Sequence, residues 1–272
     1  MNDSLSTDAA WRQLHEAATQ PYRKAGNFAW HFARGKLGRD PVFRGLIERG
    51  LIGQRRRVVD IGCGQGLFAS LLAAMAGMQA QPSRWPAVWA ATPAAAEYTG
   101  IELMPRDVAR AEASIGHLKP APRFVCEDMC KAAMPACDLV VILDVLHYVD
   151  HAAQERVLRR VHGALQPGGR LLLRVGDAGS RRGFAISQWV DRTVTRIRGH
   201  RVSPTWGRTL AEWTSLLQRL DFSEVQSIPM SAGTPFANVL LVADRGQGSS
   251  SPWAPPGRPK ALAVQPGAKV LP

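Results

Sequence analysis

Residues 58–66, VVDIGCGQG, constrain the fold of this chain more than any other segment. An apolar run ends in Asp60, and glycines then follow at the alternate positions 62, 64 and 66. We predict a buried strand over Arg57–Ile61, a tight turn, and a helix over Leu67–Met78. Glycine suits such a turn because it adopts positive φ without steric cost and lets a ligand approach the backbone. The helix would direct its unpaired N–H groups and its positive end toward that ligand.

The glycine spacing distinguishes this loop from a dinucleotide site. The dinucleotide fingerprint is G-x-G-x-x-G, and Leu67 stands where its third glycine would be. The pattern that remains, G-x-G-x-G after an acid, resembles the first motif of class I S-adenosylmethionine (SAM)-dependent methyltransferases. The resemblance implies a loop that wraps the methionine half of SAM. Its members here are Asp60, Gly62, Cys63, Gly64 and Gly66.

Three further predicted strands place an acid at their C-terminal ends. Strands over Tyr98–Leu103, Arg123–Asp128 and Asp138–Leu143 carry Glu102, Asp128 and Asp144 there. In an open parallel sheet these ends form the ligand crevice. By resemblance, Glu102 accepts hydrogen bonds from both ribose hydroxyls, and Asp128 accepts from the adenine amino group beside the backbone N–H of Met129. Leu103 and Asp144 complete the predicted cofactor site.

The rest of the pattern fits one fold class. We predict an α/β fold, a Rossmann-like seven-stranded, mostly parallel sheet with helices on both faces and the last strand antiparallel. Further helices are predicted over Arg106–Ser114, Ala152–Leu165, Arg181–Ile197 and Thr209–Leu220. A turn over Gln166–Gly169 and strands over Arg170–Asp177, Glu224–Pro229 and Asn238–Asp244 are also predicted.

The predicted domain organisation has three parts. Residues 1–52 form an N-terminal helical lead-in and cofactor lid, 53–244 the SAM-binding domain, and 245–272 a disordered tail rich in Gly, Ser and Pro. Residues 1–20 are expected to be loosely held, and two short helices to break near Gly38–Pro41. Residues 79–97, rich in Ala, Pro and Trp, indicate an inserted surface loop with apolar anchors.

The net charge of +12 is concentrated in two places. Arg181–Arg208 holds seven arginines against Asp191, and the tail from Arg245 holds four basic residues and no acid. This distribution favours one basic patch over a surface coated for nucleic acid, which makes nucleic acid an improbable partner. An RNA methyltransferase that uses the patch, and a SAM-binding scaffold without catalysis, remain alternative hypotheses.

Metal binding and membrane spanning are not expected. Cys126, Cys130 and Cys137 lie close in sequence but lack a nearby histidine, and two of them fall in predicted strands. No Asp-Asn pair of the catechol-methyltransferase type occurs. No apolar run approaches the roughly 20 residues that span a bilayer, and the start lacks the pattern of a secretory signal. We expect a cytoplasmic protein.

Methyl transfer requires a nucleophile held in line with the methyl group and, for a phenol or carbon acid, removal of a proton. His147, just after the fourth strand, is the candidate base. Tyr148 would orient the substrate, and His31 from the lid is the second candidate. Arg174 and Asp177 are candidate substrate contacts. The fourth strand lacks the N/D-P-P-Y/F motif of nucleic-acid amino-methyltransferases, since residues 144–147 read DVLH.

The chain also resembles a narrower group, the methyltransferases of bacterial aryl polyene biosynthetic clusters, which belong to secondary metabolism. The segments that carry this resemblance are Phe28–Phe43, Gly100–Ala111, Val140–Asp150, Leu171–Gly179 and Met230–Ala243. It implies a small-molecule acceptor with an aromatic head group, free or tethered to an acyl carrier protein. Carrier proteins are acidic, so the Arg181–Arg208 patch would suit such a partner.

Overall fold

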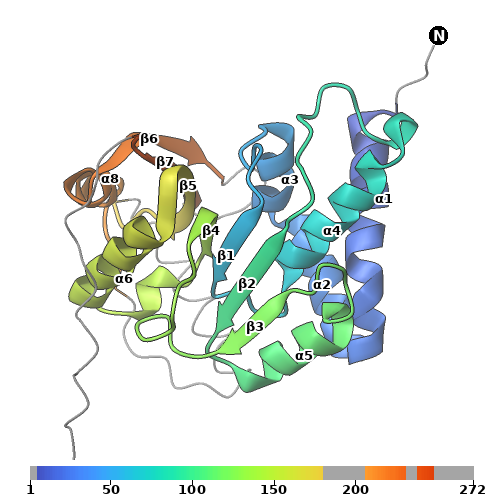
Figure 1. Ribbon diagram of the computed structural model, residues 1–272, viewed down its shortest axis with the longest axis horizontal. Coiled ribbons are helices and arrows are strands. Elements are labelled where there is room, and N and C mark those ends of the chain that lie inside the picture. Colours follow the sequence, from blue (N-terminus) through green and yellow to red (C-terminus); the bar gives the residue numbers. More distant parts are fainter. Residues whose placement is uncertain (1–4, 180–205, 231–237, 248–272) are drawn as a thin grey trace, which may run out of the picture.

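A computed structural model describes residues 5–179, 206–230 and 238–247. Within them, seven strands form one sheet in the order β3-β2-β1-β4-β5-β7-β6 (Figure 1). Neighbouring strands from β3 to β5 are parallel, whereas β7 is antiparallel to β5 and β6. The predicted fold class is therefore confirmed. The strands span Arg57–Ile61 (β1), Glu97–Glu102 (β2), Arg123–Cys126 (β3), Cys137–Leu143 (β4), Leu165–Gly176 (β5), Phe222–Pro229 (β6) and Asn238–Arg245 (β7).

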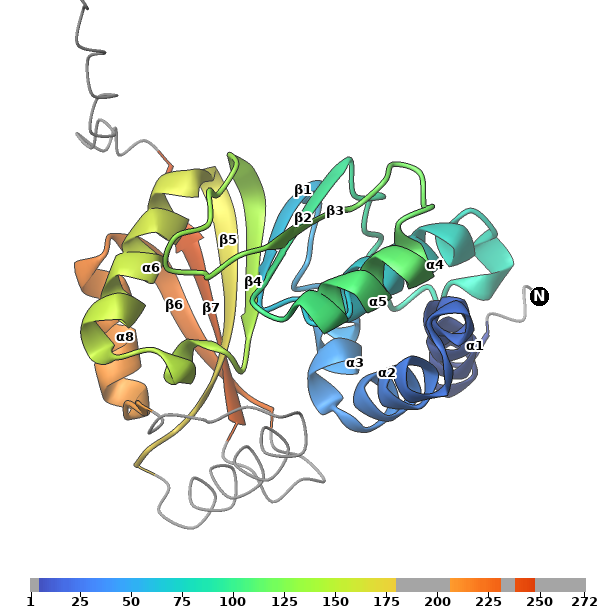
Figure 2. The same cartoon turned by 90° about the horizontal axis from the view of Figure 1, so that it is seen from below.

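Helices cover both faces of the sheet. Figure 2 shows α4, α5 and the N-terminal helices on one side and α6 and α8 on the other. Alternate strand residues supply the two cores, so Val58 packs toward the first group while Val59 packs toward the second. The helices span Thr7–Thr19 (α1), Asn27–Arg39 (α2), Pro41–Glu48 (α3), Leu67–Gln79 (α4), Pro105–Ile115 (α5), His151–Ala164 (α6) and Leu210–Arg219 (α8). Short 3-10 helices span Gln20–Ala25 (η1), Pro82–Arg84 (η2) and Leu146–Tyr148 (η3).

The expectation of a loosely held N-terminus is wrong for α1. Ser6 caps this helix, its hydroxyl accepting from the N–H of Ala9. Ala10, Leu14 and Ala18 are fully buried, and the Ser70 hydroxyl of α4 donates to the carbonyl of Ala18 at 2.7 Å. The alanines, which had suggested a loosely held segment, are instead buried, and their small side chains let α4 pack closely against α1.

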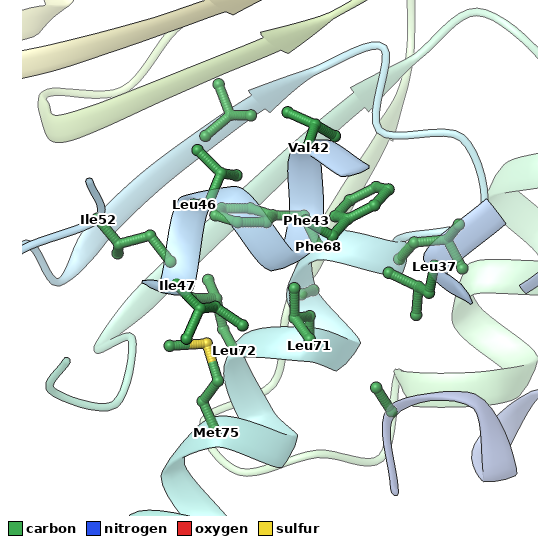
Figure 3. Packing of buried hydrophobic residues seen from close by; sticks show 14 of the residues in the cluster. Leu37, Val42, Phe43, Leu46, Ile47, Ile52, Phe68, Leu71, Leu72 and Met75 are labelled. Atoms are coloured by element: carbon green, nitrogen blue, oxygen red, sulfur yellow. The ribbon is translucent and has the colours of Figure 1, made fainter. Parts of the chain in front are cut away.

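The predicted break between the next two helices is confirmed. The Asp40 carboxylate caps α3 by accepting from the N–H of Val42 at 3.1 Å, and Pro41 occupies the first helical position. This short helix is held by packing against α4 and its surroundings, shown in Figure 3. The apolar residues labelled there are Leu37, Val42, Phe43, Leu46, Ile47, Ile52, Phe68, Leu71, Leu72 and Met75.

The turn predicted over Gln166–Gly169 is an irregularity inside β5. Cys137 of β4 pairs with Leu165, but Leu139 pairs with Arg170, so four residues of β5 oppose a single residue of β4. Gly168 there has φ +75°. The turn chemistry was recognised correctly, whereas the strand pairing before it could not be inferred from local sequence.

The inserted segment between α4 and β2 is anchored as expected. Trp89 is only 4% exposed, and the indole of Trp85 donates to its carbonyl at 3.2 Å. Arg84 Nε donates to Gln13 Oε1 of α1 at 3.1 Å. The inserted segment therefore packs against α1, on the side of the sheet that also carries α4 and α5.

Some predicted segments lie outside the described residues: the helix Arg181–Ile197, most of the Arg181–Arg208 patch and nearly all of the tail. Among the residues that are described, no helix is long and apolar enough to cross a membrane. The sheet reverses its winding between β1 and β4, which are neighbours at the centre. In such sheets ligands bind where the carboxyl ends of the strands flank this switch point.

Candidate active site

The glycine loop joins β1 to α4 beside the switch point. The N–H groups of Gly62 and Cys63 donate to the carbonyl of Ile101 at 2.8 and 3.2 Å, which fixes the loop to β2. The Tyr22 hydroxyl, fully buried on η1, donates to the carbonyl of Gln65 at 2.9 Å. Sequence analysis did not assign Tyr22 to the site, because its partner lies 43 residues away. The loop is thus held by both the sheet and the N-terminal segment.

Glu102 at the end of β2 faces this loop. Its Oε2 accepts from the N–H of Gly64 and its Oε1 from the N–H of Met104, both at 2.9 Å. Burial raises the pKa of Glu102, and these backbone N–H groups oppose the rise. Because the space that a side chain at Gly64 would fill is open within 4 Å, a ligand could reach this backbone directly. Glu102 and the loop therefore form one preorganised unit.

Asp60 is placed differently from Glu102. Its carboxylate is 4% exposed and accepts from the Tyr98 hydroxyl at 2.5 Å. Burial raises the pKa of Asp60 to about 7; the Glu102 charge adds to the rise and the Tyr98 hydrogen bond opposes it. Asp60 thus supports β1 and β2 from within the core, immediately before the loop.

We predict that Asp60 makes the folded chain less stable as the pH rises from about 4 to 7. The pKa of this carboxyl is higher in the folded than in the unfolded chain, so the folded state binds more protons in that window and loses stability on titration. Asp60→Asn keeps the acceptor for Tyr98 but cannot ionise. Urea unfolding at pH 5 and pH 8 should show a smaller decline in the variant than in the wild type. Equal declines would contradict the assignment.

Cys63 and Leu103 differ in exposure: Cys63 is buried beside the glycine loop, whereas Leu103 is exposed. Cys63 is 7% exposed, and its Sγ lies 2.6 Å from where a side chain on Gly100 would begin, so it fills the gap between loop and β2. Burial raises the pKa of its thiol well above the usual value. Leu103, in contrast, is 62% exposed directly after Glu102. It offers an apolar surface at the edge of the site.

The segment after β3 carries Asp128 and Met129. Asp128 is half-buried, and its Oδ1 accepts from the N–H of Cys130 at 2.8 Å. Arg160 of α6 donates to the carbonyls of Met129 and Cys130 at 3.0 and 2.8 Å. Arg160, which sequence analysis did not single out, therefore fixes the backbone that presents Asp128.

Asp144 lies where β4 ends, with the left-handed φ of +62°. Arg174 of β5 grips its carboxylate, with Nε donating to Oδ1 at 2.7 Å and Nη2 to Oδ2. Arg174 is 1% exposed and also donates to both oxygens of Asp40. The expected contact between Arg174 and substrate is thus not supported, because its guanidinium is enclosed by carboxylates. Asp177 is likewise engaged, accepting from Leu210 N–H at 3.1 Å.

His147 and Tyr148 lie together on η3, with ring centroids 4.2 Å apart. The N–H of Trp206 donates to the carbonyl of His147 at 2.8 Å, and Gln154 of α6 donates to the carbonyl of Trp206 at 2.8 Å. Tyr148 and Trp206 are 36% and 41% exposed. Aromatic rings therefore gather after β4, at the C-terminal edge of the sheet. Trp206 was not predicted as a site residue.

His31 belongs to a different cluster. It is exposed on α2 and its ring lies 4.7 Å from that of Trp30. The guanidinium of Arg23 lies 4.2 Å from the Trp30 ring, and that of Arg34 5.3 Å from it. The contacts that place His31 thus lie on the N-terminal helices, whereas those that place His147 lie between β4 and α6. In the described part of the chain, no group of three or more His, Cys, Asp or Glu side chains could hold a metal ion.

A Rossmann-like sheet with a glycine loop fixed on a strand-end carboxylate defines a site of the class I methyltransferase type. In agreement with this, a family described as "Methyltransferase domain" matches residues 29–227. The chain belongs to this family of SAM-dependent methyltransferases. The family predicted from the sequence, that of the SAM-dependent methyltransferases, is thereby confirmed.

Individual relatives share only part of their length with this chain. Acetylserotonin O-methyltransferase of Mus musculus is 33% identical over 181 residues, which is 63% of this chain and 40% of the mouse protein. The Rattus norvegicus protein of the same name is 30% identical over 113 residues, 40% of this chain and 24% of the rat protein. The chain therefore spans less than half the length of these relatives.

Solved structures show the same fold. Human N-acetylserotonin methyltransferase in complex with SAM has a TM-score of 0.52 at 18% identity, covering 88% of this chain and 67% of the human one. Magnesium protoporphyrin IX methyltransferase from Synechocystis with bound S-adenosylhomocysteine has a TM-score of 0.53 at 18% identity, covering 86% and 98%. At this identity the likeness concerns architecture alone.

Proposed function

We propose that this chain transfers a methyl group from SAM to a small molecule at the C-terminal edge of β1, β2 and β4. The observation that carries the proposal is the Glu102 carboxylate bound to the N–H of Gly64 at 2.9 Å. Each carboxylate oxygen has a second lone pair, so Glu102 can accept ribose hydroxyls while keeping its backbone partners. The residues proposed to surround SAM are Asp60, Gly62, Cys63, Gly64, Gly66, Glu102, Leu103, Asp128, Met129 and Asp144.

These residues fit the parts of the cofactor in different ways. Exposed Leu103 next to Glu102 would cover one face of the adenine ring, and the free lone pairs of Asp128 would accept from its amino group. Asp60 and Cys63, which are both buried, contribute by holding the conformation of the glycine loop. Asp144 contributes through its backbone, because its carboxylate is already neutralised by the Arg174 guanidinium.

The chemistry needs positioning and a base. SAM, when bound, supplies the methyl group on its sulfonium. The chain must hold the acceptor in line with that group and take up its proton. We propose His147 as the base and Tyr148 as the residue that orients the acceptor, with His31 as the second candidate base. The exposed Tyr148 and Trp206 rings favour a planar aromatic acceptor.

The narrower resemblance adds a proposal about the acceptor's origin. An aromatic head group of the aryl polyene type, free or on an acyl carrier protein, would suit these rings, in secondary metabolism of the cytoplasm. A methyl-transfer assay with phenolic acids and carrier-bound aryl groups tests this. Turnover of RNA alone, with binding that falls steeply as salt rises, would replace it with the RNA hypothesis. Tight SAM binding with no turnover on any acceptor would favour the scaffold hypothesis.

We predict that Glu102→Gln weakens SAM binding about 10- to 100-fold. The glutamine side chain keeps one oxygen acceptor, but its NH₂ group would face a backbone N–H. One charged hydrogen bond, worth about 1.5–3 kcal/mol, is therefore lost. Glu97→Gln is the matched control, since Glu97 is exposed at the opposite end of the same strand. Calorimetric titration with SAM measures both. Equal affinities for the two variants would remove Glu102 from the site.

We predict that His147→Gln lowers the rate of methyl transfer at pH 7 by about 10²- to 10⁴-fold, the usual contribution of a positioned base. SAM affinity should stay within about threefold of wild type, because the proposed role is toward the acceptor. His117→Gln, at an exposed histidine just beyond α5, controls for loss of an imidazole. Unchanged turnover in His147→Gln would exclude it as the base.

A further inference from the structure

Arg174 is the centre of a charge cluster that ties the N-terminal helices to the end of β4. We call Arg174, Asp40, Asp144 and Lys36 the Arg174 clasp. Arg174 Nη2 donates to Asp40 Oδ2 and Nε to Asp144 Oδ1, both at 2.7 Å. Lys36 Nζ lies 2.7 Å from Asp40 Oδ2 and 3.5 Å from Asp144 Oδ2. Two cations and two carboxylates balance, which is what allows a guanidinium to be 1% exposed.

The clasp joins two functional parts of the chain. Asp40 is the cap of α3, at the junction with α2. Asp144 follows β4 in the left-handed region, which a residue other than glycine adopts only at an energetic cost. The bidentate grip of Arg174 stabilises Asp144 in that conformation. Arg174 therefore links the N-terminal helices directly to the end of β4.

The conformation of Asp144 directs the path of the backbone from β4 into η3. Val145 packs so closely on the glycine loop that a side chain on Gly62 would begin 2.4 Å from Val145 Cγ1. Directly afterwards η3 presents His147 and Tyr148, and the carbonyl of His147 accepts from the N–H of Trp206. A change at Asp144 would thus reach the cofactor loop and the proposed catalytic residues together.

We propose that Arg174 is a positioning residue for methyl transfer: the Arg174 clasp fixes Asp144 and Val145 against the glycine loop, and so sets His147 and Tyr148 against the cofactor. The catalytic part of this inference rests on the proposed function. The structural part does not.

The chain provides a matched control for Arg174 on the same strand. Arg170 of β5 makes an equivalent bidentate pair with Asp244, at 2.7 Å for both bonds, near the opposite end of the sheet. Lysine keeps the charge at either position but cannot bridge a carboxylate with a planar fork. Arg174→Lys and Arg170→Lys therefore remove similar interactions, and only the first lies beside the site.

The test combines a structural and a kinetic measurement. In ¹³C-histidine-labelled protein, with His147 assigned through His147→Gln, we expect Arg174→Lys to shift or broaden the His147 signal and Arg170→Lys to leave it unchanged. At saturating SAM and acceptor, kcat should fall at least about tenfold in Arg174→Lys, as expected for misplaced groups, and the Kd for SAM should rise, because Val145 packs on the glycine loop. Arg170→Lys should keep the wild-type kcat.

An unchanged His147 signal in Arg174→Lys, or equal effects of the two lysine variants, would overturn the proposal. If Arg174→Lys does not fold, Asp144→Asn replaces it, because asparagine tolerates the left-handed φ and the Arg174–Asp40 pair remains, while the Arg174–Asp144 ion pair is lost. It is expected to shift the same signal. Failure of wild-type protein to bind SAM would instead refute the proposed function, since the histidine signal requires neither cofactor nor acceptor.

Discussion

Gly62→Ala is expected to lower the free energy of unfolding by about 2–5 kcal/mol and to abolish SAM binding. Alanine at φ +75° costs about 1–2 kcal/mol. Its methyl group would lie 2.4 and 2.7 Å from the two Cγ atoms of Val145, and relieving such overpacking costs a further 1–3 kcal/mol or so. Urea unfolding measures the first effect and calorimetry with SAM the second.

Gly64→Ala separates strain from steric conflict in the same loop. Gly64 has φ +54°, but nothing lies within 4 Å of where its side chain would begin. Only the conformational cost of about 1–2 kcal/mol is then expected. Equal stabilities of the two alanine variants would show that Val145 does not pack closely on Gly62.

Arg174→Met is expected to lower the free energy of unfolding by about 3–5 kcal/mol, because it removes the buried cation that Asp40 and Asp144 share and leaves Lys36 beside two carboxylates. Although burial acts to raise the pKa of both carboxyls, the hydrogen bonds and charge of Arg174, with the charge of Lys36, hold each pKa below its usual value. This stabilisation is therefore present at neutral pH and is lost as the pH falls below about 4. Urea unfolding at pH 7 and pH 3 should show the defect shrinking in acid.

An exposed arginine provides the comparison for Arg174. Arg44 pairs with Asp8 and Glu48, whose side chains are 74% and 37% exposed. Arg44→Met should cost about 0–1 kcal/mol, as surface ion pairs do. A defect in Arg174→Met as small as that of Arg44→Met would mean that the buried cluster contributes no more than a surface pair.

The fold and the position of the glycine loop could be predicted because their determinants are local. An apolar run, glycines at alternate positions and an acid at a strand end are read within a few residues, and parallel strands then bring Glu102 to Gly64 across 38 positions. The same reasoning placed the α2–α3 break near Gly38–Pro41. The N-terminal helix was underestimated because small buried residues carry little periodic hydrophobicity, although Ala10 and Ala18 are fully buried.

The clasp could not be predicted because its partners are remote. Asp40 and Arg174 are 134 residues apart, and no local pattern states which acid meets which base. One indication was nevertheless present. An arginine inside the apolar run LLLRVG of β5 must find carboxylates if that strand is central. Recognising this would have assigned Arg174 to a buried pair instead of to the substrate.

The central claim is that SAM occupies the edge formed by the glycine loop, Glu102 and the β4 end. A crystal structure of the chain with S-adenosylhomocysteine tests it most directly. We expect both ribose hydroxyls to bind the Glu102 carboxylate and the adenine ring to lie against Leu103, within reach of Asp128. The sulfur should lie beside the glycine loop, on the side of His147. A nucleoside bound elsewhere, or ribose hydroxyls that do not contact Glu102, would contradict it.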